Sequence, residues 1–249
     1  MMQVTETVKQ LIIINIIFFV GTLIVGQPAY DILSLHFPAN EKFQVWQIVT
    51  HMFMHGGITH ILFNMLGLWM FGSQLEQKWG AKKFLFFYMS CGIGAALLSI
   101  GISYYMFNDA VSILVENGFE KTAILDVLSH QKIDTRWKDI IGPLKLQNMT
   151  QAYFGQAVGA SGALYGTLIA FAFMFPNASL MMLFIPIPIK AKYFIPALLA
   201  YDLFSGLRGH SVLGGGDGIG HFAHLGGALI GFLMMWYWKK NQFNNNRWN

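Results

Sequence analysis

Apolar residues gather in six long runs along this chain, with shorter polar stretches between them. The first run, LIIINIIFFVGTLIV, has no charged residue, and most of the other runs also lack charged residues. A helix that crosses a lipid bilayer needs about 20 mainly apolar residues, so runs of this kind are typical of membrane spans. The pattern predicts an all-α bundle of six transmembrane helices, at about 11–25, 58–75, 84–107, 160–175, 193–204 and 221–238.

Two stretches between these runs are too polar to cross a membrane. Residues 27–57 mix aromatic residues with prolines and charges, which is typical of an interfacial loop with short helices. Residues 108–157 carry many charges, and their apolar residues are spaced as in amphipathic helices. We therefore expect one membrane domain over 1–249, with 108–157 as an extramembrane insertion between the third and fourth spans.

The composition favours a membrane protein over a soluble one. Only 11% of the 249 residues are charged, whereas about 25% is usual in a soluble domain, and the mean hydropathy is +0.48. Lipid must therefore solvate much of the apolar surface. The basic residues behind the net charge of +4 lie beside apolar runs, which favours a role in membrane topology over a nucleic-acid partner. The single cysteine, Cys91, excludes an intramolecular disulfide.

Lysine and arginine residues orient the predicted bundle. Most of those in short connections, such as Lys9, Lys78 and Lys239, fall on the side that holds both termini. The positive-inside rule then puts the termini in the cytoplasm and the polar ends of the second, fourth and sixth spans toward the outer face. No small-residue cleavage site follows the first run, so we interpret it as a retained span. The composition and the lack of a targeting extension favour a bacterial cytoplasmic membrane, with an organelle membrane as the alternative.

Several polar side chains lie within the predicted spans, where a polar group needs a partner or a function. His60 and Asn64 are four residues apart and share one face of the second span. Ser161 stands among glycines and alanines in VGASGALYG, at the start of the fourth span. His224 lies near the start of the sixth, on the same face as a G-x-x-x-G pair that lets a neighbouring helix approach closely.

These residue types indicate nucleophilic catalysis. A serine hydroxyl becomes an effective nucleophile when an imidazole accepts its proton, and small residues on facing helices would bring His224 to Ser161. The side chains of His60 and Asn64, with the Ser161 backbone amide, are candidates to stabilise an oxyanion. No acidic residue is placed to complete a triad within these helices. The sequence therefore predicts a Ser–His dyad without a metal or organic cofactor.

Three motifs, in this order, resemble those of the rhomboid family of intramembrane serine proteases. They are HGGITHILFNMLGLWMFG in the second span, VGASGALYG in the fourth and AHLGGALIG in the sixth. The resemblance covers about 43–107 and 158–238. It implies a rhomboid-like six-helix fold and proteolysis of transmembrane protein substrates in or next to the lipid bilayer.

The resemblance also implies roles for single residues. The G-x-S-G motif makes Ser161 the implied nucleophile, and the A-H motif makes His224 the implied base. Tyr165 matches the tyrosine that packs on the catalytic imidazole of the family. The implied oxyanion and substrate-binding residues are His60, Asn64, Gly159 and Tyr165.

The first loop and the insertion depart from the family pattern, whereas the end of the second span agrees with it. Gln47 follows Trp46 where many members carry arginine, and the insertion at 108–157 is longer than the usual connection. Glu76, followed by Trp79-Gly80, is similar to the end of the second span in the family. The resemblance assigns no role to the insertion.

Histidines near the motifs allow other interpretations. His221 is an alternative base, although it lies nearer the aqueous boundary, and we expect it to have a supporting polar role. His51, His55 and His60 are possible metal ligands, but neither an H-E-x-x-H motif nor a carboxylate on their face completes a zinc set. Hydrogen bonds within the loop are the more ordinary role for His51 and His55.

Two alternative functions follow from the same sequence. Tyr201-Asp202 and the glycine-rich stretch that ends at Asp217 are similar to motifs of intramembrane aspartyl proteases. Only 14 residues separate the two aspartates, which is too few to descend one span and climb the next. The other alternative is a non-catalytic member of the rhomboid-like fold that binds and escorts membrane proteins. The presence of both Ser161 and His224 favours the protease.

Overall fold

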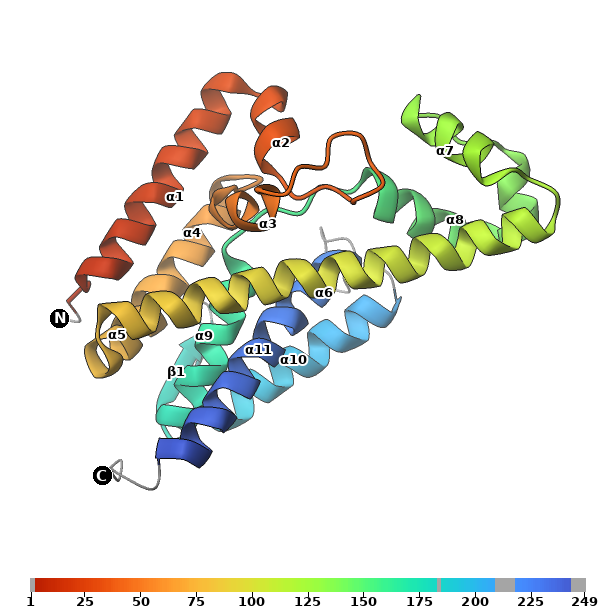
Figure 1. Cartoon of the computed structure of the whole chain (residues 1–249). Coiled ribbons are helices and arrows are strands. Elements are labelled where there is room, and N and C mark those ends of the chain that lie inside the picture. Colours follow the sequence, from red (N-terminus) through yellow and green to blue (C-terminus); the bar gives the residue numbers. More distant parts are fainter. Residues whose placement is uncertain (1–2, 183–184, 209–217, 243–249) are drawn as a thin grey trace.

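The structure is a computed structural model that describes residues 3–182, 185–208 and 218–242. These residues form a bundle of helices with one short antiparallel hairpin (Figure 1). The helices are α1 (Glu6–Val25), α2 (Gln27–Leu33), α3 (Gln47–Thr50), η1 (His51–Phe53), α4 (Ile58–Gly67), η2 (Leu68–Gly72), α5 (Ser73–Trp79), α6 (Ala81–Glu116), α7 (Lys121–Ser129), α8 (Arg136–Phe154), α9 (Ser161–Met174), α10 (Ala191–Arg208) and α11 (Gly218–Gln242), and the hairpin pairs β1 (Ser179–Met182) with β2 (Ile185–Lys190).

Helical structure occupies all six regions in which the sequence predicts a span. These regions hold α1, the continuous helix made of α4, η2 and α5, and then α6, α9, α10 and α11. By length and apolar composition alone, two helices in the described part of the chain, α1 and α6, can cross a membrane. The start of α1 and the end of α11 lie on the same side of the bundle (Figure 1). The all-α architecture is confirmed, whereas the number of spans stays a prediction.

The outward faces of the helices are strongly apolar. On α1, Ile17, Leu23 and Ile24 have exposed fractions of 62, 67 and 80%. Large aliphatic side chains are similarly exposed on α11, where Leu229 and Leu233 stand out from the bundle. A soluble monomer rarely exposes apolar patches of this extent, so these faces suit contact with lipid.

The third predicted span ends later than the sequence suggests. We expected it to stop near residue 107, but α6 continues without a break to Glu116 and is 36 residues long. Polar residues such as Asp109 are compatible with a helix, and the chain turns only at Asn117 and Gly118, where Gly118 has a φ of +91°. The first residues of the predicted insertion therefore belong to the end of α6.

The insertion has a hydrophobic core of its own. Trp137, Leu114 and Leu128 are fully buried there, and they come from α8, α6 and α7. Buried apolar residues of these three helices form this core, whereas Val115 is exposed, and the position of the insertion outside the membrane stays a prediction. The insertion also contacts the loop between α2 and α3, because Leu35 and Ala157 exchange two backbone hydrogen bonds of 3.0 and 2.9 Å. Figure 1 shows α7 and α8 at one end of the molecule, away from α1.

Glycines allow α9 and α11 to touch backbone to backbone. A β-carbon on Gly227 would overlap the carbonyl oxygen of Gly162, and one on Gly231 would lie 2.7 Å from the Cα atom of Gly166. Because no side chain separates the two helices at these points, their backbones are closer than bulkier residues would permit. The prediction that small residues bring the fourth and sixth helices together is confirmed.

Glu76 fixes the start of α1 against α5. Its carboxylate accepts hydrogen bonds from the backbone amides of Thr7 and Val8, each at 3.0 Å, and from the hydroxyl of Thr5. The first amides of a helix have no acceptor within the helix, so a carboxylate at this position satisfies them and complements the helix dipole. The end of the α4–η2–α5 helix is thereby joined to the first helix.

Replacing Gly227 by alanine tests the close packing of α9 and α11. The added methyl group would overlap the backbone of α9, so we expect Gly227→Ala to lower the apparent unfolding temperature in detergent by roughly 5 to 10 °C. Gly101→Ala on α6 is the control, because nothing lies within 4 Å of its β-carbon position. Alanine should be neutral or slightly stabilising there. Equal unfolding temperatures for the two variants would show that the contact does not limit stability.

Candidate active site

Ser161 and His224 meet at one end of the contact between α9 and α11. Ser161 is the first residue of α9, and His224 lies in the second turn of α11. The hydroxyl of Ser161 lies 2.9 Å from Nε2 of His224, which is the distance of a good hydrogen bond. The structure therefore brings together the two residues that the sequence singled out as a nucleophile and its base.

Tyr165 holds the imidazole of His224 from one side. The two rings are stacked, with their centroids 4.2 Å apart and their planes at 9°. Tyr165 stands one turn after Ser161 on the same face of α9, so a single helix contributes both the hydroxyl and the ring that supports its partner. This packing matches the role that the family resemblance implied for Tyr165.

A carboxylate lies next to Nδ1 of the imidazole, on a helix that carries none of the motifs. We expected no acidic residue within the motif-bearing helices to complete a triad; Oδ1 of Asp202, on α10, lies 3.2 Å from Nδ1 of His224. The same oxygen lies 2.5 Å from Nδ1 of His221. Asp202 is only 1% exposed. From the sequence we considered only the helices that carry the motifs, whereas Asp202 comes from the helix between the fourth and sixth predicted spans, and the predicted dyad stays a prediction.

The contacts of the two histidines define the direction of the hydrogen bonds. A carboxylate accepts, so His221 and His224 each donate an Nδ1–H to Asp202, and Nε2 of His224 is left to accept the proton of Ser161. His221 therefore has the supporting polar role that we expected. No contact of His221 with Ser161 occurs in the described residues.

Asp202, His221 and His224 also have the composition of a metal site, since their potential ligand atoms all lie within 4.8 Å of one another. Two ligands of a tetrahedral zinc ion, each about 2.1 Å from the metal, lie about 3.4 Å apart. The 2.5 Å between His221 and Asp202 is shorter than that and is a hydrogen-bond distance. The observed geometry is therefore that of a hydrogen-bonded cluster.

Gly159 and His60 form the wall opposite His224. Gly159 has a φ of +127°, which only glycine adopts easily, and its amide donates a 2.9 Å hydrogen bond to the carbonyl of His51. A β-carbon at Gly159 would lie 2.8 Å from Nε2 of His60 and 3.6 Å from Oγ of Ser161. The His60 ring and the Ser161 hydroxyl thus face the same space, which any larger residue at position 159 would fill.

The sequence suggested Asn64 as an oxyanion donor, but the contact observed for its side chain is with the backbone of α4. Its Nδ2 atom donates a 3.0 Å hydrogen bond to the carbonyl of His60, one turn earlier in α4. Asn64 is only 4% exposed, and it does not line the cavity beside Ser161. The amide has a second N–H, so its role as an oxyanion donor stays a prediction.

A cavity of about 340 Å³ opens beside Ser161 and His224. Its walls come from α4, α6, α9 and α11, from the loop that holds His36 and Phe37, and from the end of the insertion near Gln151. This volume is enough for water and for a short stretch of extended chain, since one water molecule takes about 30 Å³ of liquid volume. The reacting groups therefore have room for both partners of a hydrolysis.

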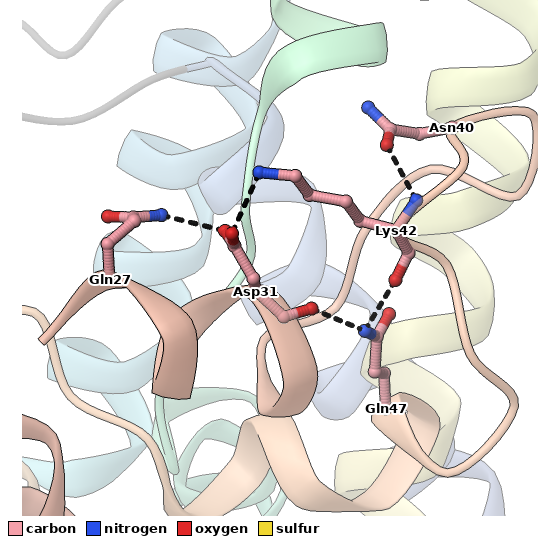
Figure 2. A network of polar contacts seen from close by, with 5 residues as sticks. All are labelled: Gln27, Asp31, Asn40, Lys42 and Gln47. Atoms are coloured by element: carbon pink, nitrogen blue, oxygen red, sulfur yellow. Dashed lines mark hydrogen bonds and ion pairs between the residues drawn. The ribbon is translucent and has the colours of Figure 1, made fainter. Parts of the chain in front are cut away.

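The loop in front of this cavity is held by Gln47, where many members of the resembling family carry arginine. Its side-chain amide donates to the carbonyls of Asp31, Ile32 and Lys42 at 3.2, 3.3 and 2.9 Å. Figure 2 shows the bonds of Gln47 to Asp31 and Lys42, and Lys42 also pairs with the Asp31 carboxylate at 2.9 Å. The Lys42 ammonium lowers the pKa of that carboxyl group. Gln47 is fully buried, so an uncharged side chain ties the loop together.

The two other histidines of this loop differ in their contacts. His51 uses Nδ1 for a 2.8 Å hydrogen bond to the carbonyl of Gln47, as we expected. The ring of His55 packs edge-on against that of His60, and the backbone of Phe53 is its hydrogen-bond partner within the loop. Burial lowers the pKa of both His51 and His55 to about 4.

Comparison with known proteins decides the family. The model of the Rhomboid domain matches residues 42–115 and 140–241, which is most of the chain. The chain belongs to the rhomboid family. The match leaves out residues 116–139, which hold α7.

Relatives of this rhomboid protein come from several kinds of organism. It is 29% identical to Rhomboid protein 1, mitochondrial, of Saccharomyces cerevisiae over 194 residues, which are 78% of this chain and 42% of the yeast protein. It is 27% identical to Rhomboid protease AarA of Providencia stuartii over 202 residues, which are 76% of this chain and 54% of that protein. The chain thus spans about half the length of these relatives.

Rhomboid proteins are integral membrane proteins, and this chain is accordingly a membrane protein. A third relative, RHOMBOID-like protein 1 of Arabidopsis thaliana, is 29% identical over 219 residues, which are 83% of this chain and 40% of the plant protein. Because the relatives include mitochondrial, plant and bacterial proteins, the bacterial cytoplasmic membrane stays a prediction.

Sequence reasoning missed the role of two residues in this rhomboid structure. A signal for Asp202 was present, since an acidic residue in an otherwise apolar run needs a partner, and two histidines were available nearby. We weighed Asp202 only as a possible aspartyl-protease residue, together with Asp217, which lies outside the described residues. Gln47 was noted only as a departure from the family pattern.

We expect the rhomboid fold to lose stability as the pH falls from 7 to 5. Unfolding returns His51 and His55 from pKa values of about 4 to the ordinary value of 6.5, so the unfolded chain binds more protons in this range. Each histidine should lower the free energy of unfolding at pH 5 by on the order of 1 to 2 kcal/mol. Thermal unfolding in detergent across this range measures the slope.

Variants of the two loop histidines identify the source of this slope. The double variant His51→Asn with His55→Leu should show a flatter dependence of the unfolding temperature on pH. His130→Gln is the control, because the side chain of His130 is 64% exposed. An unchanged slope in the double variant would mean that other groups cause the pH dependence.

Proposed function

We propose that this chain is an intramembrane serine protease that hydrolyses peptide bonds in or near the spans of other membrane proteins. Ser161 is the nucleophile and His224 is the base in this proposal. The observation that carries it is the 2.9 Å contact between the Ser161 hydroxyl and Nε2 of His224. Membership of a family with named proteases among its members supports the same reaction class.

In the proposed reaction, Nε2 of His224 accepts the proton of Ser161 while Oγ attacks the carbonyl carbon of the scissile bond. The protonated imidazole then gives its proton to the leaving amine, and the acyl group stays on Oγ as an ester. A water molecule attacks this ester with the same proton transfers, which releases the acid and restores both side chains. The stacked Tyr165 ring keeps the imidazole in place throughout.

The oxyanion of this reaction would form on the side of Ser161 that faces Gly159 and His60. Ser161 begins α9, so its backbone amide has no acceptor within the helix and can donate to the oxyanion. Nε2 of His60 faces the same space and is the proposed side-chain donor. Asn64 holds the carbonyl of His60 and would act by fixing that turn of α4.

The membrane setting proposed for this site is a six-span bundle with its termini in the cytoplasm. The reacting groups then lie toward the outer face, below the loop that holds His36 and the insertion. Hydrolysis needs water, and the cavity of about 340 Å³ beside Ser161 offers a route for it. Substrates would be transmembrane proteins whose helices unwind locally, so small or helix-breaking residues near the cut should favour cleavage.

Two alternatives to this proposal are His221 as the base and an escort protein without catalysis. His221 is a poorer candidate for the base, because among the described contacts it is Nε2 of His224 that reaches the Ser161 hydroxyl, at 2.9 Å. An escort protein without catalysis would need the binding surface alone. The hydrogen-bonded Ser161 and His224 would then have no function, which favours the protease.

Reconstitution with a model substrate tests the proposed protease activity. We expect the purified protein in liposomes to cleave a single-span substrate, and Ser161→Ala to cleave it more than about a thousandfold more slowly. A fluorophosphonate probe should label the wild type but leave Ser161→Ala unlabelled. The matched control is Ser73→Ala, which removes a fully buried hydroxyl on α5, away from the cavity.

The outcomes separate the two functions. Equal cleavage by the wild type and Ser161→Ala would exclude Ser161 as the nucleophile. Binding of substrate with neither cleavage nor labelling of the wild type would favour the escort function. Loss of cleavage in His224→Asn, with activity retained in His221→Asn, would assign the base.

A further inference from the structure

We propose that a groove between the interfacial loop (27–57) and the insertion (108–157) binds an extended extramembrane segment of the substrate, next to the stretch that is cut. The inference rests on the proposed function and gives it a second contact surface, the outer groove. One wall of the outer groove comes from residues 27–42 of the loop, and the other from residues 128–156 of the insertion. Its volume of about 570 Å³ is typical of ligand-binding sites, which range from about 300 to 1,000 Å³.

The outer groove continues the cavity beside Ser161. His36 and Gln156 line both spaces. Gln156 precedes Ser161 by five residues, and five fully extended residues span at most about 18 Å. A substrate chain that is held at Ser161 therefore reaches the outer groove after roughly five extended residues.

The two walls of the outer groove differ in chemistry. The loop wall carries the polar side chains of Gln27, Asn40 and Glu41, and the insertion wall carries apolar ones such as Leu128 and Ile133. Successive side chains of an extended chain point to opposite sides, so a segment in which apolar and polar residues alternate would fit both walls at once. A lipid acyl chain would leave the polar wall without hydrogen-bond partners, which favours a peptide as the occupant.

Hydrogen bonds between the walls make the outer groove a preformed site. The side-chain amide of Asn40 donates to the carbonyl of Tyr153 at 2.9 Å, and the backbone bonds between Leu35 and Ala157 join the same two segments a second time. Figure 2 shows that the amide oxygen of Asn40 also accepts a hydrogen bond from the backbone of Lys42, at 3.0 Å. A preformed site loses little conformational freedom when a ligand binds, so a short segment can bind there.

The backbone of Gln131 supports a functional role for this wall. Among the described residues, Gln131 is the one residue other than glycine with a positive φ, at +56°. It stands just after the C-cap of α7, where glycine is the usual residue because it adopts this conformation freely. Its side chain lines the outer groove, where the amide can both donate to and accept from the backbone of an extended segment. That use would explain why a glutamine occupies an unfavourable backbone position.

His36 leaves a hydrogen-bonding group unused at the junction of the two spaces. Its side chain is only 2% exposed, and its Nε2 atom has no hydrogen-bond partner within the described residues. A buried polar atom without a partner is unfavourable. The backbone of a segment that passes from the cavity into the outer groove would supply the missing partner.

The insertion wall lies partly outside the family match. The Rhomboid domain model leaves out residues 116–139, and these include Leu128, Ser129, Gln131 and Ile133 of the outer groove. Ser161 and His224 belong to the matched part. The outer groove would therefore select among substrates, and this gives the insertion a role that the family resemblance does not assign.

The central experiment compares two single-span substrates that differ only in the extramembrane segment next to the cut. One segment has about ten residues in alternating apolar and polar order, and the other is a Gly-Ser segment of the same length, which stays a flexible coil. We expect the wild type in liposomes to show a KM about tenfold lower for the alternating segment, with kcat values within about threefold of each other, because the segment adds binding without changing the chemistry.

A matched pair of variants tests whether the outer groove causes this difference. Ser129 lines the outer groove, whereas Ser112 lines neither space. Each hydroxyl donates to the carbonyl three residues earlier, at 2.8 and 2.9 Å, so both tryptophan variants lose the same kind of bond. Ser129→Trp should fill the groove and make the two KM values equal. Ser112→Trp should keep the difference of about tenfold.

Gln131→Gly keeps the test decisive if Ser129→Trp does not fold. Glycine relieves the positive φ, so the unfolding temperature should equal or exceed that of the wild type. The variant loses the amide, so KM for the alternating substrate should rise about threefold or more. A purely structural role of Gln131 predicts an unchanged KM, and that result would then overturn the inference.

Two other results overturn the inference. They are equal KM values of the wild type for the two substrates, and an unchanged difference in a folded Ser129→Trp, as expected if lipid occupies the groove. Ser161→Ala separates this failure from that of the proposed function. It cannot cut, but in detergent it should bind the free alternating segment as tightly as the wild type does. If Ser161→Ala cleaves as well as the wild type, the proposed function itself fails.

Discussion

The backbone contact between α9 and α11 is the constraint on which the rest of the structure depends. Gly162 and Gly166 on one helix face Gly227 and Gly231 on the other, and no side chain keeps the two helices apart. In lipid, such contacts replace the hydrophobic driving force that packs helices in water. The hydroxyl and the imidazole are placed by the same contact, so fold stability and site geometry share one cause.

Around this contact, a largely apolar chain keeps its polar groups in a few connected clusters. Glu76 satisfies the first turn of α1, Gln47 satisfies three carbonyls of the outer loop, and Asp202 joins two histidines. Each side chain is buried or nearly so. Glu76 and Asp202 join different helices, whereas Gln47 joins residues 5 to 16 positions away within the outer loop. A few buried polar residues therefore join the helices, the outer loop and the candidate site, where lipid could not satisfy their hydrogen bonds.

The sequence predicted those parts of the molecule that follow from local pattern. The helix positions follow from apolar runs, and the pairing of Ser161 with His224 follows from small residues on both helices and from the family motifs. The contacts of Asp202 were missed because its partner His224 is 22 residues away on another helix, and spacing within one helix does not reveal how two helices cross. Gln47 was missed because its acceptors are backbone carbonyls, which carry no residue-specific signal. The end of α6 was misplaced because polar residues were taken as a helix end although neither glycine nor proline occurs between Phe107 and Gly118.

The unbroken length of α6 has a structural consequence for the molecule. Its middle section, at Gly92 and Ala95, forms part of the wall beside Ser161, while its last turns, at Val111 and Leu114, lie in the core of the insertion. At 1.5 Å per residue, its 36 residues make a rod about 54 Å long. One helix therefore links the wall of the cavity directly to the core of the insertion, with no loop between them.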